Sequence, residues 1–247
     1  MYLTTKGLVL RVSDYNDRDA LLTLLTPEHG KITVKARGLR RKNSPLTAPC
    51  QLLALGEFTL FEYRDSYSIN EAHSIELFQG LRKDIVKLSL GTYFAQVAEL
   101  LSMEDMPNSE LLSLVLNCLF ALSSLSDSEN KVKAVFELRC ACLSGYTPDL
   151  YACHQCGQQD ANRFDVSNGT LSCATCRQSE SAGIRMPLTP SVLDAMRYII
   201  SCDPKRLLSF DASENTLVQL SQITELYLTT QLERGFSTLD FYKSLFL

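Results

Sequence analysis

The chain has 247 residues, of which 45% are hydrophobic and 21% are charged, as is typical of a globular protein with one large or two small domains. Its 24 Lys and Arg residues against 28 Asp and Glu residues give a formal net charge of −4. This excludes the class of proteins that are strongly basic over their whole surface. The most apolar run, residues 111–125, contains Asn117 and three serines and is too short to cross a bilayer.

The first 76 residues predict short β-strands separated by turns. Strands are expected at residues 3–12, 20–26, 31–37, 52–63 and 67–75. Five short strands with a long connection after the third fit a small closed barrel of the OB type, and an SH3-like barrel would give a similar pattern. The fold class expected is therefore an α+β multidomain protein that begins with a five-stranded OB-fold domain at residues 1–78.

Residues 31–42 carry six cations in an otherwise acidic chain. Apolar Ile32, Val34 and Ala36 alternate with polar neighbours, as in a half-buried strand with a basic outer face. The connection that follows, residues 38–51, contains two prolines and is expected to be exposed and mobile. A cation cluster of this kind suits a polyanion, and a solvated strand face is the alternative.

After residue 78 the hydrophobic period changes from two to 3.6, which predicts an α-helical domain over residues 79–247. Helices are expected at residues 86–101, 111–125, 132–143, 191–201 and 215–232. Asn108 or Ser109 should cap the second of these, which is apolar nearly all round and should be buried. The third should end near Gly145, and Thr189 followed by Pro190 should open the fourth.

Four cysteines form the most specific motif in the sequence. Two CxxC pairs, Cys153 with Cys156 and Cys173 with Cys176, match the spacing of a zinc ribbon inserted at residues 151–178. Four thiolates fill the coordination of one structural Zn²⁺ per chain, and Asn168-Gly169 should make a hairpin turn between the pairs. Two disulfides and a redox CxxC are the alternatives, and His154 could replace one ligand.

The other five cysteines lie in apolar or helical contexts without regular spacing, which is typical of free thiols in a reducing cytosol. No pair of residues predicts catalysis. The three histidines lack a neighbouring nucleophile, and no phosphate-binding glycine motif is present. Asp14, Asp17 and Asp19 form the one acidic cluster, which we interpret as a solvated loop and not as a nuclease site. The chain is therefore predicted not to be an enzyme.

The order of a small barrel, a helical domain and an inserted pair of CxxC motifs resembles that of the bacterial RecO family of recombination mediators. The resemblance extends over almost the whole chain. The matching motifs are GLVLR at 7–11, DY at 14–15, TLLTPEHGK at 23–31, KARGLR at 35–40, FELR at 136–139, GYTPDL at 145–150, LERGF at 232–236 and the two CxxC pairs. The resemblance implies an OB-fold, a helical domain and a zinc-binding insert. It also implies a bacterial cytoplasmic, nucleoid-associated protein.

The resemblance further implies binding of single- and double-stranded DNA and annealing of complementary strands, including strands covered by the single-stranded DNA-binding protein (SSB). With RecR, the family helps RecA to replace SSB during repair, and it hydrolyses nothing. We predict that eight cations contact DNA phosphates without reading bases. They are Lys31, Lys35, Arg37, Arg40, Arg41, Lys42, Arg11 and Arg18. Base stacking would have to use Tyr15, Phe58, Phe61, Tyr63 or Tyr67.

The family analogy also points to an apolar cleft for the SSB tail in the helical domain, beside Lys131, Lys133 and Arg139. Exposed helix charges are usually solvated, which is the plainer interpretation of these three. A zinc-ribbon scaffold that acts only through protein contacts, in transcription or ribosome assembly, is the alternative function. A nuclease is a third and less favoured function.

Overall fold

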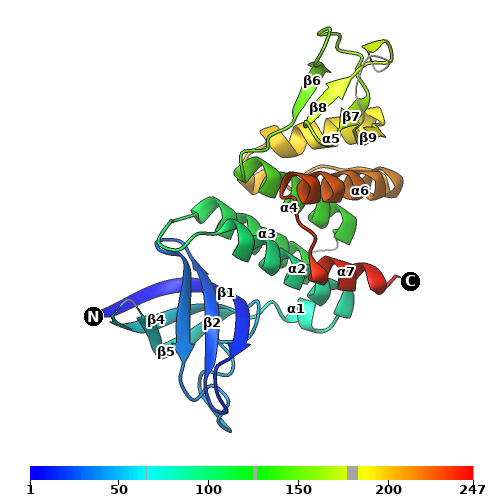
Figure 1. Ribbon diagram of the computed structural model, residues 1–247. Helices are drawn as coiled ribbons and strands as arrows, with labels where there is room; N and C mark the ends of the chain where they lie inside the picture. The colour runs from blue at the N-terminus through cyan, green and yellow to red at the C-terminus, as the bar shows by residue number, and fades with distance from the viewer. Residues whose placement is uncertain (65, 125–126, 177–182, 247) are drawn as a thin grey trace. The chain divides into compact units, whose positions relative to one another are not determined.

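The computed structural model describes residues 1–64, 66–124, 127–176 and 183–246. They form two compact units, Met1–Leu125 with Phe236–Leu247, and Ser126–Gly235. The first unit begins with five strands, drawn in blue to cyan in Figure 1. These are β1 (Tyr2–Asp14), β2 (Ala20–Thr26), β3 (Gly30–Ala36), β4 (Leu55–Tyr63) and β5 (Ser66–Glu76).

The five strands close into a barrel in the order β1-β2-β3-β5-β4, with β3 and β5 parallel and the other pairs antiparallel. This is the OB-type barrel that the sequence predicted. Strand β3 shows why the pattern was informative, because Ile32, Val34 and Ala36 are buried while Thr33 is exposed and the two lysines of the strand are half-buried. Alternation of this kind places one face of each strand in the barrel core.

The connection from β3 to β4 differs from the expected exposed loop. Successive backbone hydrogen bonds make it a chain of turns, for example from Arg41 N to Gly38 O and from Cys50 N to Leu46 O, each 3.1 Å. Leu46, Cys50 and Ala54 belong to the barrel core, so only the first half of the connection is a surface loop. For the same reason β4 begins at Leu55 and not at residue 52.

Four helices complete the first unit: α1 (Gln79–Arg82), α2 (Ile85–Leu101), α3 (Ser109–Ser124) and α7 (Ser237–Ser244). Helices α2 and α3 contact strands β1 and β2 of the barrel. Asn108 caps α3 by accepting a hydrogen bond from Leu111 N at 3.0 Å, as predicted. Helix α3 was expected to be buried, and one face of it is, including Leu111, Val115 and Cys118, whereas Phe120 on the other face is 51% exposed. The sequence did not predict α1 or α7.

The second unit consists of α4 (Glu129–Leu143), α5 (Pro190–Ser201), α6 (Glu214–Gln231), a short 3-10 turn and a small sheet. The sheet has the order β6-β8-β7-β9, formed by β6 (Asp149–Cys153), β7 (Arg163–Asp165), β8 (Thr170–Ser172) and β9 (Arg185–Pro187). In Figure 1 it lies next to α5. Thr189 caps α5 and Gly145 follows α4 with φ +88°, both as predicted. None of the described helices is long and apolar enough to span a bilayer.

Candidate metal centre and nucleic-acid interface

The four cysteines of the CxxC pairs come together in the second unit. Their sulfur atoms all lie within 4.8 Å of one another, and the Sγ atoms of Cys156 and Cys173 are 3.8 Å apart. A tetrahedral ion with metal–sulfur distances of about 2.3 Å requires sulfur atoms about 3.8 Å apart. All nine cysteines are free thiols, so the predicted disulfide alternative is not formed. The group therefore fits a metal ion with four thiolate ligands.

The small sheet holds the two halves of this cluster together. Cys153 ends β6, Cys173 follows β8, and these two strands run parallel. The backbone N of Cys173 lies 3.4 Å from the sulfur of Cys153, and Gly157 adopts φ +73° to turn the first knuckle. His154 is exposed and lies outside the sulfur group among the described residues. Asn168-Gly169 makes the hairpin turn between β7 and β8, as predicted.

Backbone N–H groups favour the thiolate form of the first cysteine in each knuckle. Donation from Cys156 N–H lowers the pKa of Cys153 to about 6 against the opposing effect of burial, and Cys176 N–H lowers that of Cys173. Hydrogen bonds with the sulfurs of Cys156 and Cys173 raise the pKa of Cys176 to about 12. Thiolate is the form that binds metals, so the turn geometry prepares two of the four ligands.

The eight cations predicted to contact DNA fall into two groups. Arg11 and Lys31 face helix α2 and have partners there. The Arg11 Nε atom lies 3.0 Å from a carboxylate oxygen of Glu99, and the Lys31 ammonium donates to the backbone oxygen of Glu99 at 3.0 Å. These two side chains hold the barrel to α2, and their availability to DNA depends on opening those contacts.

The other six cations gather at one end of the barrel, which we call the loop-end surface. They are Arg18, Lys35, Arg37, Arg40, Arg41 and Lys42. Two hydrogen bonds join the β1–β2 loop to the basic connection there, from Arg40 N to Arg18 O at 3.1 Å and from Gly38 N to Asp19 Oδ1 at 2.8 Å. Residues that are about twenty positions apart in sequence thereby form one basic surface.

Two of these six cations are paired with carboxylates. Lys35 lies 3.6 Å from Asp19, and Arg40 contacts Asp14. The remaining four, Arg18, Arg37, Arg41 and Lys42, are exposed and form no ion pair within the part of the chain that the structure describes. They provide uncompensated positive charge for a polyanion.

The acidic cluster in the β1–β2 loop has a structural explanation. Hydrogen bonds from the Gly38 backbone and the Asn16 side chain lower the pKa of Asp19, and Lys35 adds to the effect. The Asp19 carboxylate thus fastens the loop to the end of β3, while Asp14 holds Arg40. Over the described residues, the four cysteines form the single group that could hold a metal.

The five aromatic candidates for base stacking lie in different environments. Phe58 is fully buried in the barrel core, so the structure removes it from the candidates. Tyr67 packs partly buried against the same core. Phe61 and Tyr63 are exposed on β4, while Tyr15 is 54% exposed in the β1–β2 loop, within the loop-end surface.

The three cations of α4 predicted to contact a peptide have partners inside the second unit. Lys131 pairs with Asp127 at 2.9 Å, and Arg139 donates to Ile200 O at 3.1 Å. Lys133 is buried and ion-paired to Glu137 at 3.0 Å. A peptide contact by these residues would require those bonds to open. That role stays a prediction.

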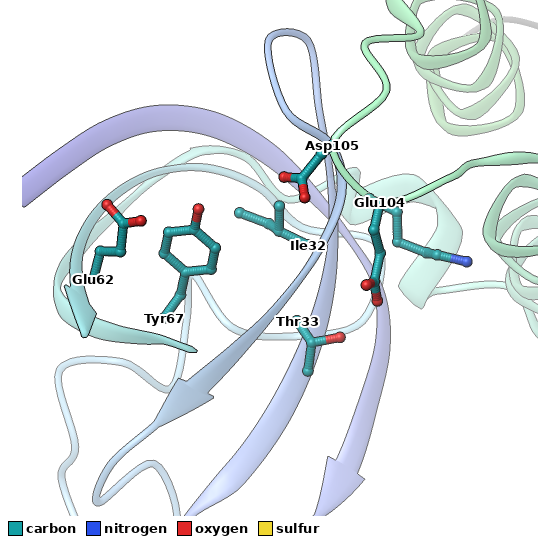
Figure 2. Close-up of a pocket in the computed structure, with 7 residues that line it drawn as sticks. Ile32, Thr33, Glu62, Tyr67, Glu104 and Asp105 are labelled. Carbon is teal, nitrogen blue, oxygen red and sulfur yellow. The ribbon is translucent and has the colours of Figure 1, made fainter. Parts of the chain in front are cut away.

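Sequence reasoning missed a polar pocket beside the barrel, shown in Figure 2. It has a volume of about 360 Å³ and is lined by Lys31, Ile32, Thr33, Glu62, Tyr67, Glu104 and Asp105. Three carboxylates line it against one ammonium group, and that group is already bonded to Glu99 O. The pocket therefore disfavours phosphate. No sequence pattern predicted it because β3, β4, β5 and the α2–α3 connection all contribute to it.

Comparison with known proteins agrees with this architecture. The family model for the N-terminal part of recombination protein O matches residues 1–78, and that for its C-terminal part matches residues 82–240. The DNA repair protein RecO of Acetivibrio thermocellus is 31% identical over 246 residues, which cover 99% of this chain and 97% of that protein. The RecO protein of Bacillus subtilis is 28% identical over 228 residues, covering 92% and 88%. The chain therefore belongs to the RecO family of DNA repair proteins.

Proposed function

We propose that this protein is a recombination mediator that works without catalysing a chemical step. It binds single- and double-stranded DNA, anneals complementary strands and, with RecR, helps to load RecA onto DNA covered by SSB. The observation that carries this proposal is the loop-end surface, where four exposed cations lie together and form no ion pair with any carboxylate of the described residues. Family membership supports the repair role and does not favour the alternative, a zinc-ribbon scaffold acting only through protein contacts.

The physical task of annealing is to bring two polyanions together. Cations at the loop-end surface would neutralise phosphates on one strand and so lower its repulsion for the complementary strand. Holding both strands on one protein raises their effective concentration, which accelerates pairing without a reactive group. Contacts to phosphates carry no sequence information, so the activity would be independent of sequence.

We further propose that the four cysteines hold one structural Zn²⁺. Their sulfur geometry fits tetrahedral coordination, and four thiolates leave no open position for water. The ion would fix the two knuckles to each other and thereby stabilise the small sheet of the second unit. The role of Cys153, Cys156, Cys173 and Cys176 would be to hold the fold.

The direct test is annealing of complementary oligonucleotides that are already covered by SSB. The protein is expected to accelerate duplex formation, measured by fluorescence energy transfer between labelled strands, and to do so without nucleotide or divalent metal. A rate equal to that of the SSB-covered strands alone would contradict the mediator proposal and favour the scaffold. Strand cleavage on product gels with magnesium or manganese would instead indicate a nuclease.

Removing the unpaired charges should change the salt dependence of binding. Changing Arg37, Arg41 and Lys42 together to alanine removes three phosphate contacts, so the slope of log K against log salt on single strands should flatten by about 2. The control changes three exposed cations of the second unit, Lys205, Arg206 and Arg234, and leaves the same net charge. Fluorescence anisotropy of a labelled single strand over a salt series measures the slope for both triple variants. An equal slope for the two triple variants would move the DNA site away from the loop-end surface.

A further inference from the structure

Tyr15 is the aromatic side chain that lies within the loop-end surface. The residue is 54% exposed, and the Lys35 ammonium lies over one face of its ring, 4.1 Å from the ring centroid. The ring therefore combines a cation on one side with a surface open to solvent. Exposed tyrosine rings beside phosphate-binding cations are the arrangement on which unpaired bases stack in single-stranded nucleic acids.

The loop that carries Tyr15 is fixed before any ligand arrives. The Asn16 side-chain oxygen accepts hydrogen bonds from Arg18 N at 2.9 Å and from Asp19 N at 2.8 Å, which closes a tight turn directly after Tyr15. The Asp19 carboxylate then binds Gly38 N, Lys35 and the Asn16 amide. A base that stacks on Tyr15 would meet a ring that is already positioned, so little conformational entropy would be lost on binding.

The charge around the ring favours a nucleic-acid backbone. The loop-end surface to which the ring belongs carries six cations against three carboxylates, Asp14, Asp17 and Asp19. Two of these carboxylates are engaged, Asp14 with Arg40 and Asp19 with Lys35, while Arg18 and Arg37 have no ion-pair partner among the residues that the structure describes. Phosphates can therefore bind to cations of the same surface while an adjacent base reaches the ring.

We propose that Tyr15 stacks on an unpaired base and so makes the loop-end surface prefer single-stranded over double-stranded DNA. In a duplex each base is already stacked and paired, so only the phosphates are available to this surface. In a single strand the same phosphates bind and one base adds its contact with Tyr15. This inference rests on the proposed DNA-binding function and assigns one residue the discrimination between the two forms.

The chain contains no tryptophan, which allows a direct optical test. In a Tyr15→Trp variant the new indole is the only one, and stacking on a base is expected to quench its fluorescence when a short oligothymidylate of roughly ten nucleotides saturates the protein. The matched control is Tyr63→Trp. Tyr63 is 56% exposed with the Arg64 guanidinium 5.1 Å from its ring centroid, but it lies at the β4–β5 turn. Quenching of the Tyr15→Trp protein alone is the expected result.

An oligonucleotide that has the sugar-phosphate backbone but no bases distinguishes quenching by a stacked base from quenching by a nearby phosphate. The abasic oligonucleotide of the same length should bind the Tyr15→Trp protein without quenching it. Binding by oligothymidylate, shown by anisotropy of a labelled strand, without any quenching would overturn the stacking role and leave the proposed function intact. Equal or greater quenching of the Tyr63→Trp protein would overturn it too. Absence of binding to any DNA would overturn the proposed function together with this inference.

Affinity measurements supply the second readout. Tyr15→Ala should weaken single-strand binding about tenfold, because one stacked base is lost, and should leave duplex binding within about twofold. Tyr15→Phe keeps the ring and should bind single strands as the unchanged protein does. An equal loss of affinity for single strands and duplex in Tyr15→Ala would show that Tyr15 serves only to support the loop, and would overturn the inference.

Discussion

Changing Cys173 to serine is expected to abolish binding of the Zn²⁺ ion that we propose for the four cysteines. Cys173 is buried, its backbone N–H contacts the sulfur of Cys153, and its own sulfur lies 3.8 Å from that of Cys156. Serine does not provide a thiolate, so the affinity for Zn²⁺ should fall by orders of magnitude, since ligand donation supplies most of the binding free energy at such sites. Metal content should drop from about one equivalent per chain to well below half.

The structural consequence should stay within the second unit. Strands β6 and β8 each connect to one knuckle, so backbone hydrogen exchange is expected to accelerate over residues 149–172. The barrel belongs to the other compact unit and should keep its affinity for DNA. Elemental analysis and hydrogen-exchange mass spectrometry measure the two effects.

Cys202→Ser is the matched control for this experiment. Cys202 is half-buried in the same unit but is not part of the sulfur group, so its replacement should leave the metal content unchanged. Two results would contradict the metal proposal. One is an unchanged protein, never treated with chelator, that contains well under half an equivalent of metal. The other is a Cys173→Ser protein that retains its metal.

The features that the sequence predicted well are those encoded by neighbouring residues. The CxxC pairs specify their own knuckles, and Thr189 with Pro190 specifies the start of α5. The alternation in β3 follows from the two-residue period of a strand. Each of these depends on contacts within a few positions of the chain, so spacing alone is sufficient.

The features that the sequence did not predict depend on distant contacts. Arg11 and Lys31 were expected on an open basic face, but the carboxylate and the backbone oxygen of Glu99 engage them from a helix that begins after the barrel ends. Leu46 and Cys50 lie in a turn-rich segment without periodicity, so nothing in the pattern showed that they fill the barrel core. Composition gives the number of cations on a segment but not which of them are covered.

Lys133 is the clearest case of a charge whose environment the sequence could not show. Helix charges are usually solvated, but its side chain is only 3% exposed. Its ammonium lies 3.0 Å from Glu137 on the same helix and 2.8 Å from Glu225 on α6. The second carboxylate is 92 positions away in the chain, and the packing of α4 on α6 brings it there.

Changing Lys133 to methionine should strongly destabilise the second unit. The change leaves Glu137, which is fully buried, without its counter-ion, and removal of one partner from a buried ion pair costs about 3–5 kcal/mol. The hydrogen bond from Thr224 to Glu137, 2.8 Å long, would remain but carries no charge. Chemical denaturation followed by circular dichroism measures the free energy of unfolding.

The loss should depend on pH in a defined direction. Burial raises the pKa of Glu137, and Lys133 opposes that rise in the unchanged protein. Without Lys133 the pKa in the folded state is higher still, so the folded protein binds the Glu137 proton more tightly than the unfolded chain does. Stability of the variant should therefore fall as the pH rises above about 4.3, the ordinary value for glutamate, and should recover in acid.

Two further variants make this prediction specific to the buried pair. Lys131→Met is the control, because Lys131 lies two positions away and also forms an ion pair with a carboxylate four positions along the chain, that of Asp127. That pair is less buried than the Lys133 pair, so its loss should cost clearly less. Lys133→Met with Glu137→Leu removes both charges, while Glu225 can turn to solvent because it is 21% exposed. This double variant should recover most of the lost stability, since apolar replacement of a whole buried pair is often neutral. A double variant less stable than Lys133→Met alone would show that Glu137 stabilises the unit through its hydrogen bond to Thr224 and not through Lys133.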